Sequence, residues 1–183
     1  MSRSSIALCA GFFGLILALP SLTYALDDPA CKPLYEVSRK ANLIPYHMYS
    51  TTVAGYNRNQ PENSEMISTG GANGVIYVMV RGKWTRTRLT PGDLVKDKDE
   101  GASTAKNTCR YLRDEALNGE AASVYNSHSD TEVGKVDTTI WISKSKGLPL
   151  REDIDIDVGG SMGKSHKSIR FEYGNVHPPA GVQ

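Results

Sequence analysis

The sequence predicts an α+β fold, in which a strongly curved antiparallel sheet packs on an N-terminal helix. One stretch after residue 27 has helical spacing and helical end signals, whereas the apolar residues that follow gather in many short β-type runs. Turn sequences such as Arg81-Gly82 and Asn118-Gly119 separate several of these runs, as in a meander of antiparallel strands. A curved sheet of this kind buries one face against the helix and leaves room for a cavity that holds an apolar ligand.

Residues 1–25 have the layout of a cleaved signal peptide. Arg3 supplies a positive start, residues 6–19 form an apolar core, Pro20 breaks it, and Thr23-Tyr24-Ala25 is a small-x-small cleavage site. This apolar run is too short to span a membrane, because a membrane-spanning helix needs about 20 apolar residues. We therefore expect cleavage after Ala25, a periplasmic or secreted location, and no transmembrane segment in the mature chain.

The rest of the chain has equal numbers of acidic and basic residues, because Arg3 is the one charged residue of the signal segment. No net field steers such a chain to nucleic acid, so we predict no nucleic-acid partner. Its length suits one domain, expected over residues 26–176. The tail over residues 177–183, which contains two prolines, is expected to fray.

Cys31 and Cys109 are the two cysteines that follow the signal segment. An exported protein meets an oxidising compartment, so we predict a disulfide between them. In the loop-entropy model a bond across so long a loop is worth about 4 kcal/mol. Free or metal-bound thiols are the alternative, but two cysteines without a nearby histidine make a poor zinc site, and we predict no metal.

The predicted helix begins at Asp28, a capping residue, with Pro29 in its first turn. Leu34, Val37 and Ala41 follow helical spacing and form an apolar stripe, and Cys31 lies on nearly the same stripe. The helix is expected to end within residues 42–45, since a proline at position 45 disfavours helix at the residue before it.

The β-type runs predict nine strands, rich in valine, isoleucine, threonine and tyrosine. Between the fourth and fifth, residues 93–105 are polar, charged and at best weakly helical, so we expect a lid or an exposed loop there. The predicted strands cover residues 46–56, 64–68, 75–80, 83–89, 109–116, 121–127, 135–143, 150–158 and 168–173.

The segment Gly159-Gly160-Ser161-Met162-Gly163 matches the G-x-S-x-G pattern of a hydrolase nucleophile turn. That turn requires a helix after the serine, and an acid and a histidine further along the chain. Here the following residues are strand-like and the chain soon ends, so we interpret the segment as a glycine-rich hairpin turn. We predict no enzyme activity and no catalytic residue, with an esterase that uses Ser161 as the alternative.

Asp153, Asp155 and Asp157 alternate with apolar residues, which predicts a strand with one wet face. Carboxylates two residues apart are separated by about 7 Å along a strand, too far for all three to hold one ion. We expect Lys167 and Arg170 on the neighbouring strand to relieve their repulsion. The histidines show no ligand spacing and are interpreted as surface or strand residues; they are His47, His128, His166 and His177.

Trp84, Arg86 and Arg88 share one face of a predicted strand. Aromatic rings with arginine suit a nucleic-acid base or a phospholipid head group, and export argues against the nucleic acid. A solvated strand face is the other interpretation.

Large apolar residues of the strands are the candidates for lining a cavity. The alternation of the sequence does not say which face of the sheet looks inward. The candidate lining residues are Tyr77, Met79, Trp84, Ile140, Trp141, Ile142 and Phe171.

Residues 141–151 spell W-I-x-x-x-x-G-L-P-L-R, with Gly147 placed to make a turn and Leu148-Pro149 to start the returning strand. This string resembles the late hairpin of the periplasmic lipoprotein-localisation factors and the related lipid-carrier lipoproteins. The resemblance implies an unclosed half-barrel with a hydrophobic concave face, lidded by helices, that carries an acyl chain or a lipid-modified protein. This sequence departs from the family pattern in having one clear helix.

Two functions stay open. The first is a non-catalytic exported carrier or binding protein for a lipid, acyl chain or lipoprotein in the bacterial periplasm, without a cofactor. The alternative is a structural or protein-interaction domain of the envelope, with a solid core, an envelope protein as its partner and no small ligand. A cavity of several hundred Å³ distinguishes the two.

Overall fold

The computed structural model describes residues 28–54, 61–102, 106–131, 134–160 and 163–182. The predicted signal peptide, its cleavage site and Ser161 lie outside the described residues.

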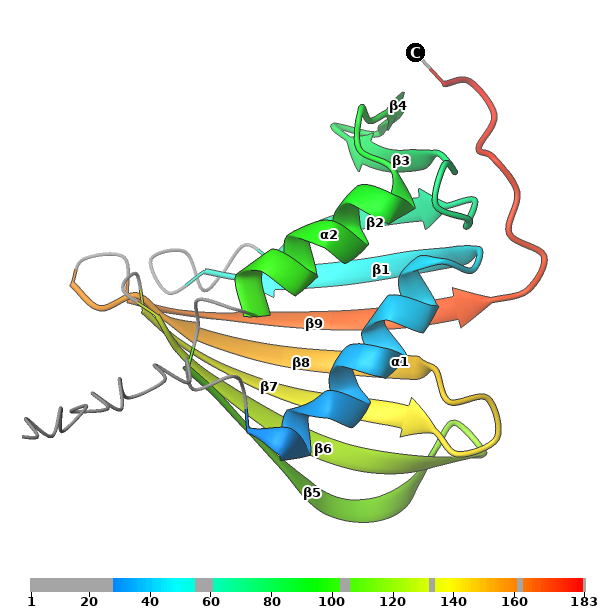
Figure 1. The fold of residues 1–183 in the computed structure, drawn as a ribbon. Helices are drawn as coiled ribbons and strands as arrows, with labels where there is room; N and C mark the ends of the chain where they lie inside the picture. The colour runs from blue at the N-terminus through cyan, green and yellow to red at the C-terminus, as the bar shows by residue number, and fades with distance from the viewer. Residues whose placement is uncertain (1–27, 55–60, 103–105, 132–133, 161–162, 183) are drawn as a thin grey trace, which may run out of the picture.

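One antiparallel sheet makes up most of the described chain (Figure 1). Its nine strands run in the order β4-β3-β2-β1-β9-β8-β7-β6-β5, and within the described residues the two edge strands, β4 and β5, do not pair with each other. The sheet is strongly curved and unclosed, which confirms the predicted fold class. The strands are β1 (Tyr46–Val53), β2 (Glu62–Ser68), β3 (Ile76–Val80), β4 (Lys83–Arg86), β5 (Lys106–Leu117), β6 (Glu120–Thr131), β7 (Gly134–Ser143), β8 (Pro149–Asp157) and β9 (Lys164–Tyr173).

The predicted N-terminal helix is confirmed. A short 3-10 turn, η1 (Pro29–Cys31), leads into α1 (Lys32–Asn42). Asp28 caps the start, since its Oδ1 accepts a hydrogen bond of 3.0 Å from the backbone N–H of Ala30. Leu34 and Ala41 are buried on the side of α1 that faces the sheet. Figure 1 shows α1 crossing the concave face of the sheet obliquely.

A second helix, α2 (Pro91–Ala102), lies where the sequence predicts a lid or an exposed loop with weak helical character. It starts with a reciprocal capping box, a helix start signal that the composition of this polar segment does not reveal. The N–H of Thr90 donates to Asp93 Oδ2 at 2.8 Å, and the N–H of Asp93 donates to Thr90 Oγ1 at 3.2 Å. The backbone N–H of Thr90, and then its hydroxyl, which donates to Asp93 Oδ2 at 2.7 Å, hold the pKa of the Asp93 carboxyl below its usual value. Pro91 then suits the first helical position.

The register divides the side chains between two faces, because residues directly opposite each other in a pair of strands point the same way. We call the concave face, which α1 covers, the inner face and the opposite one the outer face. On the inner face Cys31 is bonded to Cys109 of β5, with an S–S distance of 2.07 Å, and this confirms the predicted disulfide. Leu34 and Ile142 pack around the bond as an inner core.

A second, smaller core lies on the outer face. There Trp141 of β7 packs against Ala122 and Val124 of β6, and Leu117 and Leu150 flank the cluster. The sheet is therefore stabilised from both sides in the region of β5 to β8.

The hairpin between β7 and β8 has the predicted turn. Gly147 adopts a left-handed φ of 61°, and its N–H donates to the carbonyl of Ser143 at 2.9 Å. Gly159 and Gly160, which follow β8, are also left-handed, with φ of 67° and 59°. The chain then enters strand β9, so no helix follows the G-x-S-x-G segment as a nucleophile turn requires.

The aspartate row faces outward as predicted, but its partners differ. Asp153 accepts a hydrogen bond from Arg151, Asp155 pairs with His166 at 2.9 Å, and Asp157 lies 3.5 Å from the ammonium of Lys164.

The prediction that Lys167 and Arg170 relieve the repulsion among the three aspartates is wrong, because the strand register gives these two basic residues other neighbours. Lys167 lies opposite Ile154 and therefore points to the inner face. Arg170 donates to Glu172 and stacks over the ring of Tyr49 at 4.3 Å.

Candidate ligand-binding cleft

A cleft of about 340 Å³ lies between the inner face of the sheet and the two helices. Its walls come from six elements that meet at the centre of the fold: α1, α2, β1, β2, β8 and β9. The lining residues are Ser38, Ala41, Asn42, Tyr46, Met48, Met66, Leu94, Pro149, Glu152, Ile169 and Phe171.

The floor of the cleft is a row of apolar side chains across three strands. Met48 of β1 lies opposite Met66 of β2 and opposite Phe171 of β9, so the three side chains point to the same face. Ile169, two residues from Phe171 along β9, extends the row. Methionine is flexible and fills irregular spaces, so this floor can adapt to an apolar chain without a fixed outline.

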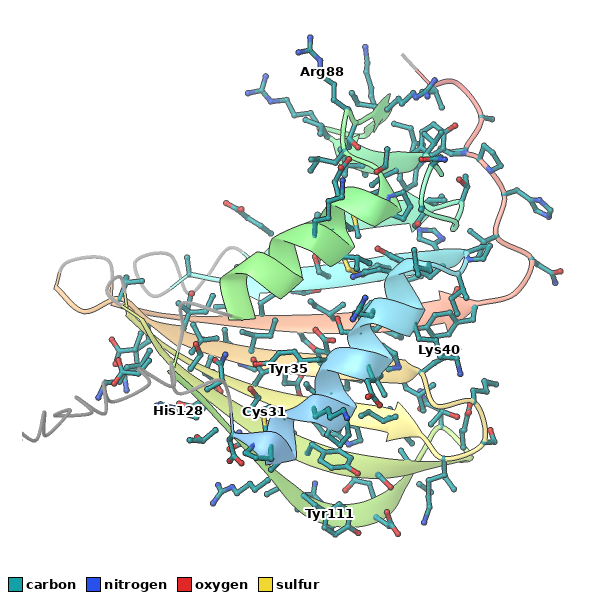
Figure 2. All side chains as sticks on the ribbon, in the orientation of Figure 1. Cys31, Tyr35, Lys40, Arg88, Tyr111 and His128 are labelled. Carbon is teal, nitrogen blue, oxygen red and sulfur yellow. A yellow bond between two sulfur atoms is a disulfide. The ribbon has the colours of Figure 1, made fainter. Side chains whose placement is uncertain are left out.

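The roof is made by the helices. Ser38 and Ala41 come from α1, and Leu94 comes from the start of α2. The segment 93–105, where the sequence predicts a lid or an exposed loop, thus overlaps α2, and this helix places Leu94 over the cleft. Figure 2 shows α1 and α2 side by side in front of the sheet, with Tyr35 and Lys40 on α1.

One end of the cleft is polar. Glu152 of β8 lies near the buried phenol of Tyr46 and the half-buried phenol of Tyr173. Burial, and then the charge of Glu152, raises the pKa of Tyr46 to about 12 and raises the pKa of Tyr173 further. Both phenols stay protonated at physiological pH, and the hydroxyl of Tyr173 donates to the carbonyl of Pro149 at 2.8 Å.

Asn42, the last residue of α1, adds an amide to this wall. The residue is 8% exposed, and its Nδ2 has no hydrogen-bond partner among the residues that the structure describes. Buried amide donors are almost always paired. The group is therefore suited to donate to an oxygen of a ligand.

The seven predicted lining residues do not gather in one place. Phe171 lines the cleft. Ile140 and Ile142 share its face, but they pack in the inner core beside the disulfide.

The other four predicted lining residues point to the outer face. Trp141 cannot share a face with its neighbours Ile140 and Ile142, since successive residues of a strand alternate. Tyr77 lies opposite Ile67, and Met79 lies opposite Trp84, whose ring packs at 5.9 Å from the ring of His47. The cleft is instead lined by Met48, Met66, Leu94 and Ile169, which the sequence analysis did not name. The alternation of apolar residues along β1 and β9 is visible in the sequence, but only the strand pairing shows which residues point to the inner face of the sheet.

A depression of about 440 Å³ lies on the outer face, near β5, β8 and β9. Its lining includes Glu120, Arg151, Arg170 and Glu172, and each of these side chains already pairs with an opposite charge. Leu117 and Leu150 also line it, so its lining is mixed, whereas the lining of the inner cleft is mostly apolar. The inner cleft is therefore the better candidate for an apolar ligand.

Three of the histidines face a carboxylate on an adjacent strand. His47 pairs with Glu65, His128 with Asp137 and His166 with Asp155, each at 2.9 Å. Within the described residues, no group of three histidine, cysteine, aspartate or glutamate side chains is placed to hold a metal ion. These pairs are typical of strand surfaces, where cross-strand partners stabilise the sheet.

Neither helix of the described chain is both long enough and apolar enough to cross a bilayer.

No protein-family model matches the chain, and no curated protein matches it in sequence. Among solved structures, MucB is similar with a TM-score of 0.45 and 12% identity, over 84% of this chain and 62% of MucB. This chain thus spans less than two thirds of MucB. The MucA/MucB complex of Pseudomonas aeruginosa gives a TM-score of 0.43 and 12% identity, over 84% of this chain and 59% of that one.

Proteins that share most of their length with this chain are also similar in structure. A LolA superfamily protein from Nitrosomonas europaea has a TM-score of 0.30 and 10% identity, over 83% of this chain and 96% of its own. A putative outer membrane lipoprotein-sorting protein domain from Vibrio parahaemolyticus has a TM-score of 0.28 and 9% identity, over 80% of this chain and 93% of its own. The function proposed below rests on the geometry of the cleft.

Proposed function

We propose that this chain is a non-catalytic, exported carrier that binds the acyl chain of a lipid or lipoprotein in the cleft beneath α1 and α2. The observation that carries the proposal is a cleft of about 340 Å³ with an apolar floor and an apolar roof. Ligand sites in proteins range from about 300 to 1,000 Å³, so this cleft suits one acyl chain better than a two-chain lipid.

Burial supplies the affinity. Each methylene group moved from water into an apolar site contributes about 0.8 kcal/mol, so ten buried methylenes contribute about 8 kcal/mol before the costs of ordering. The row of Met48, Met66 and Phe171 offers this burial without bonds of fixed direction. Shape and burial are then sufficient for binding, and no bond chemistry is needed.

The polar end of the cleft orients the ligand. The Nδ2 of Asn42 is available to donate to a carboxyl or ester oxygen. An acyl group is therefore expected to bind with its oxygen-bearing head toward Asn42 and its chain along the apolar floor.

Two observations bear on the location and on the alternative function. The Cys31–Cys109 disulfide supports an oxidising compartment outside the cytoplasm. The alternative, an envelope domain with a solid core and a protein partner, requires an interior without a cavity of several hundred Å³. The cleft favours the carrier.

Filling the cleft tests the proposal. Ser38 of α1 lines it and is half-buried, so Ser38→Trp directs an indole into the space for the ligand. If the indole displaces only two methylene groups, binding weakens about 15-fold. Titration with a fluorescent acyl ester measures the dissociation constant.

Glu36→Trp is the matched control, because Glu36 lies on the same helix and is exposed. This variant should bind the probe like the wild type. If Ser38→Trp and the wild type, both folded, bind the probe with equal affinity, the acyl chain does not bind in this cleft and the proposal is contradicted.

A further inference from the structure

Four basic side chains gather at one edge of the sheet, on β4 and at its two ends. They are Arg81, Lys83, Arg86 and Arg88, and we call them the basic edge. All four are exposed, and none of them forms an ion pair or a side-chain hydrogen bond with any residue that the structure describes. Figure 2 shows the side chain of Arg88 extending away from the sheet at this edge.

The basic edge is a local concentration of charge in a nearly neutral chain, whose formal net charge is +1. Residues 81–92 contain no acidic residue, and the paired strand β3 is uncharged. Several basic residues elsewhere are already neutralised: Lys144, Lys146 and Arg113 each pair with a carboxylate. The basic edge is thus the part of the described surface where an anionic partner finds several cations that are not already neutralised.

Apolar side chains lie next to these cations. Val80 and Leu89, at the two ends of the same stretch, are 50% and 49% exposed, and Trp84 is half-buried on the outer face. Exposed aliphatic residues flanked by lysine and arginine are typical of surfaces that enter the boundary between lipid head groups and acyl chains. Tryptophan favours the same boundary.

The partner of an edge strand is often an added strand, but β4 is poorly suited to that role. It has four residues, and lysine and arginine on a short edge strand oppose pairing with another chain. We propose that the basic edge docks this chain on an anionic membrane surface, with its cations on lipid phosphates and with Val80 and Leu89 in the interface.

Docking at this edge brings the cleft to the membrane. Two residues separate Arg88 from the start of α2, and Leu94 in the first turn of that helix forms part of the roof of the cleft. A docked β4 therefore holds the start of α2 near the head groups. The docking inference goes beyond ligand binding in the cleft and is tested without it.

The test measures binding of the chain, as exported and processed by an expression host, to vesicles of phosphatidylglycerol and phosphatidylcholine in equal amounts. The variant Lys83→Gln/Arg86→Gln/Arg88→Gln removes three cations that form no ion pair or side-chain hydrogen bond with any of the described residues. Each basic residue near an anionic surface contributes about a fivefold gain in affinity, so we expect the triple variant to bind about 100-fold more weakly. Wild-type binding should also decrease with added salt and be lost on vesicles of phosphatidylcholine alone.

The control variant is Arg110→Gln/Lys135→Gln/Lys164→Gln, which changes the net charge equally at exposed positions on β5, β7 and β9. It should bind within a few-fold of the wild type, and single variants such as R86Q should lose about fivefold. Equal losses in both triple variants would show that net charge alone causes the effect, and would overturn the proposal. The proposal would also be overturned if the triple variant of the basic edge bound vesicles as tightly as the wild type, or if the wild type did not bind them. Binding of a polyglutamate peptide through these residues, without vesicle binding, would also overturn it in favour of a protein partner. Ser38→Trp should keep vesicle binding, which separates this inference from the function of the cleft.

Discussion

Replacement of Cys31 and Cys109 together with alanine should lower the free energy of unfolding by about 4.5 kcal/mol. The bond joins residues 78 positions apart, and a cross-link across so long a loop removes much of the freedom of the unfolded chain. Domains are stable by only about 5 to 15 kcal/mol, so the loss brings the fold close to the point of unfolding.

Urea unfolding of the double variant measures the effect, and the wild type reduced with dithiothreitol should match it. The same change should weaken ligand binding, since the bond fixes the start of α1 to β5 and so holds the roof of the cleft over the sheet. A loss below about 1 kcal/mol, the size of a single hydrogen bond, would contradict this role of the disulfide.

Trp141→Ala should destabilise the fold by about 3 to 5 kcal/mol, the usual cost of removing a large buried aromatic ring. The ring is buried on the outer face against Ala122 and Val124, and its Nε1 donates to Glu115. Arg151 stacks over it, with the guanidinium carbon 5.1 Å from the ring centre. Thermal unfolding measures the loss.

The milder variant Trp141→Phe separates a structural role from a ligand-binding one. It keeps most of the apolar contact and loses the hydrogen bond to Glu115, which helps to hold the pKa of that carboxyl below its usual value. We expect moderate destabilisation and an unchanged affinity for an acyl probe. A large loss of affinity in folded Trp141→Phe would restore this residue to the ligand site, as the sequence alone suggested.

Local signals in the sequence were sufficient for much of the fold. The cap at Asp28 and the apolar stripe of Leu34 and Ala41 identified α1, and the oxidising compartment identified the disulfide. Gly147 identified the hairpin between β7 and β8, because the left-handed backbone there favours glycine. The helix α2 was predicted only weakly, since the signal lies in the hydrogen bonds between Thr90 and Asp93 rather than in composition.

The candidate site was harder to predict because it depends on pairing between distant strands. Met48 lies beside Phe171 only because β1 pairs with β9, near the other end of the chain, and no turn signal specifies that pairing. Alternation told which residues of one strand share a face, but not which face looks inward. The predicted set therefore mixed both faces, with Trp141 between Ile140 and Ile142 as the clearest case.

The most direct test of the central claim is the place where an acyl chain binds. A fatty-acyl ester with a photoreactive diazirine in its tail, activated by light on the folded protein, labels the residues that surround it, and peptide mass spectrometry identifies them. The account predicts labels on the floor and roof of the cleft, at Met48, Met66, Leu94 and Phe171, and their loss in Ser38→Trp but not in Glu36→Trp. Labels confined to the outer face, or no labelling above that of the denatured chain, would contradict it.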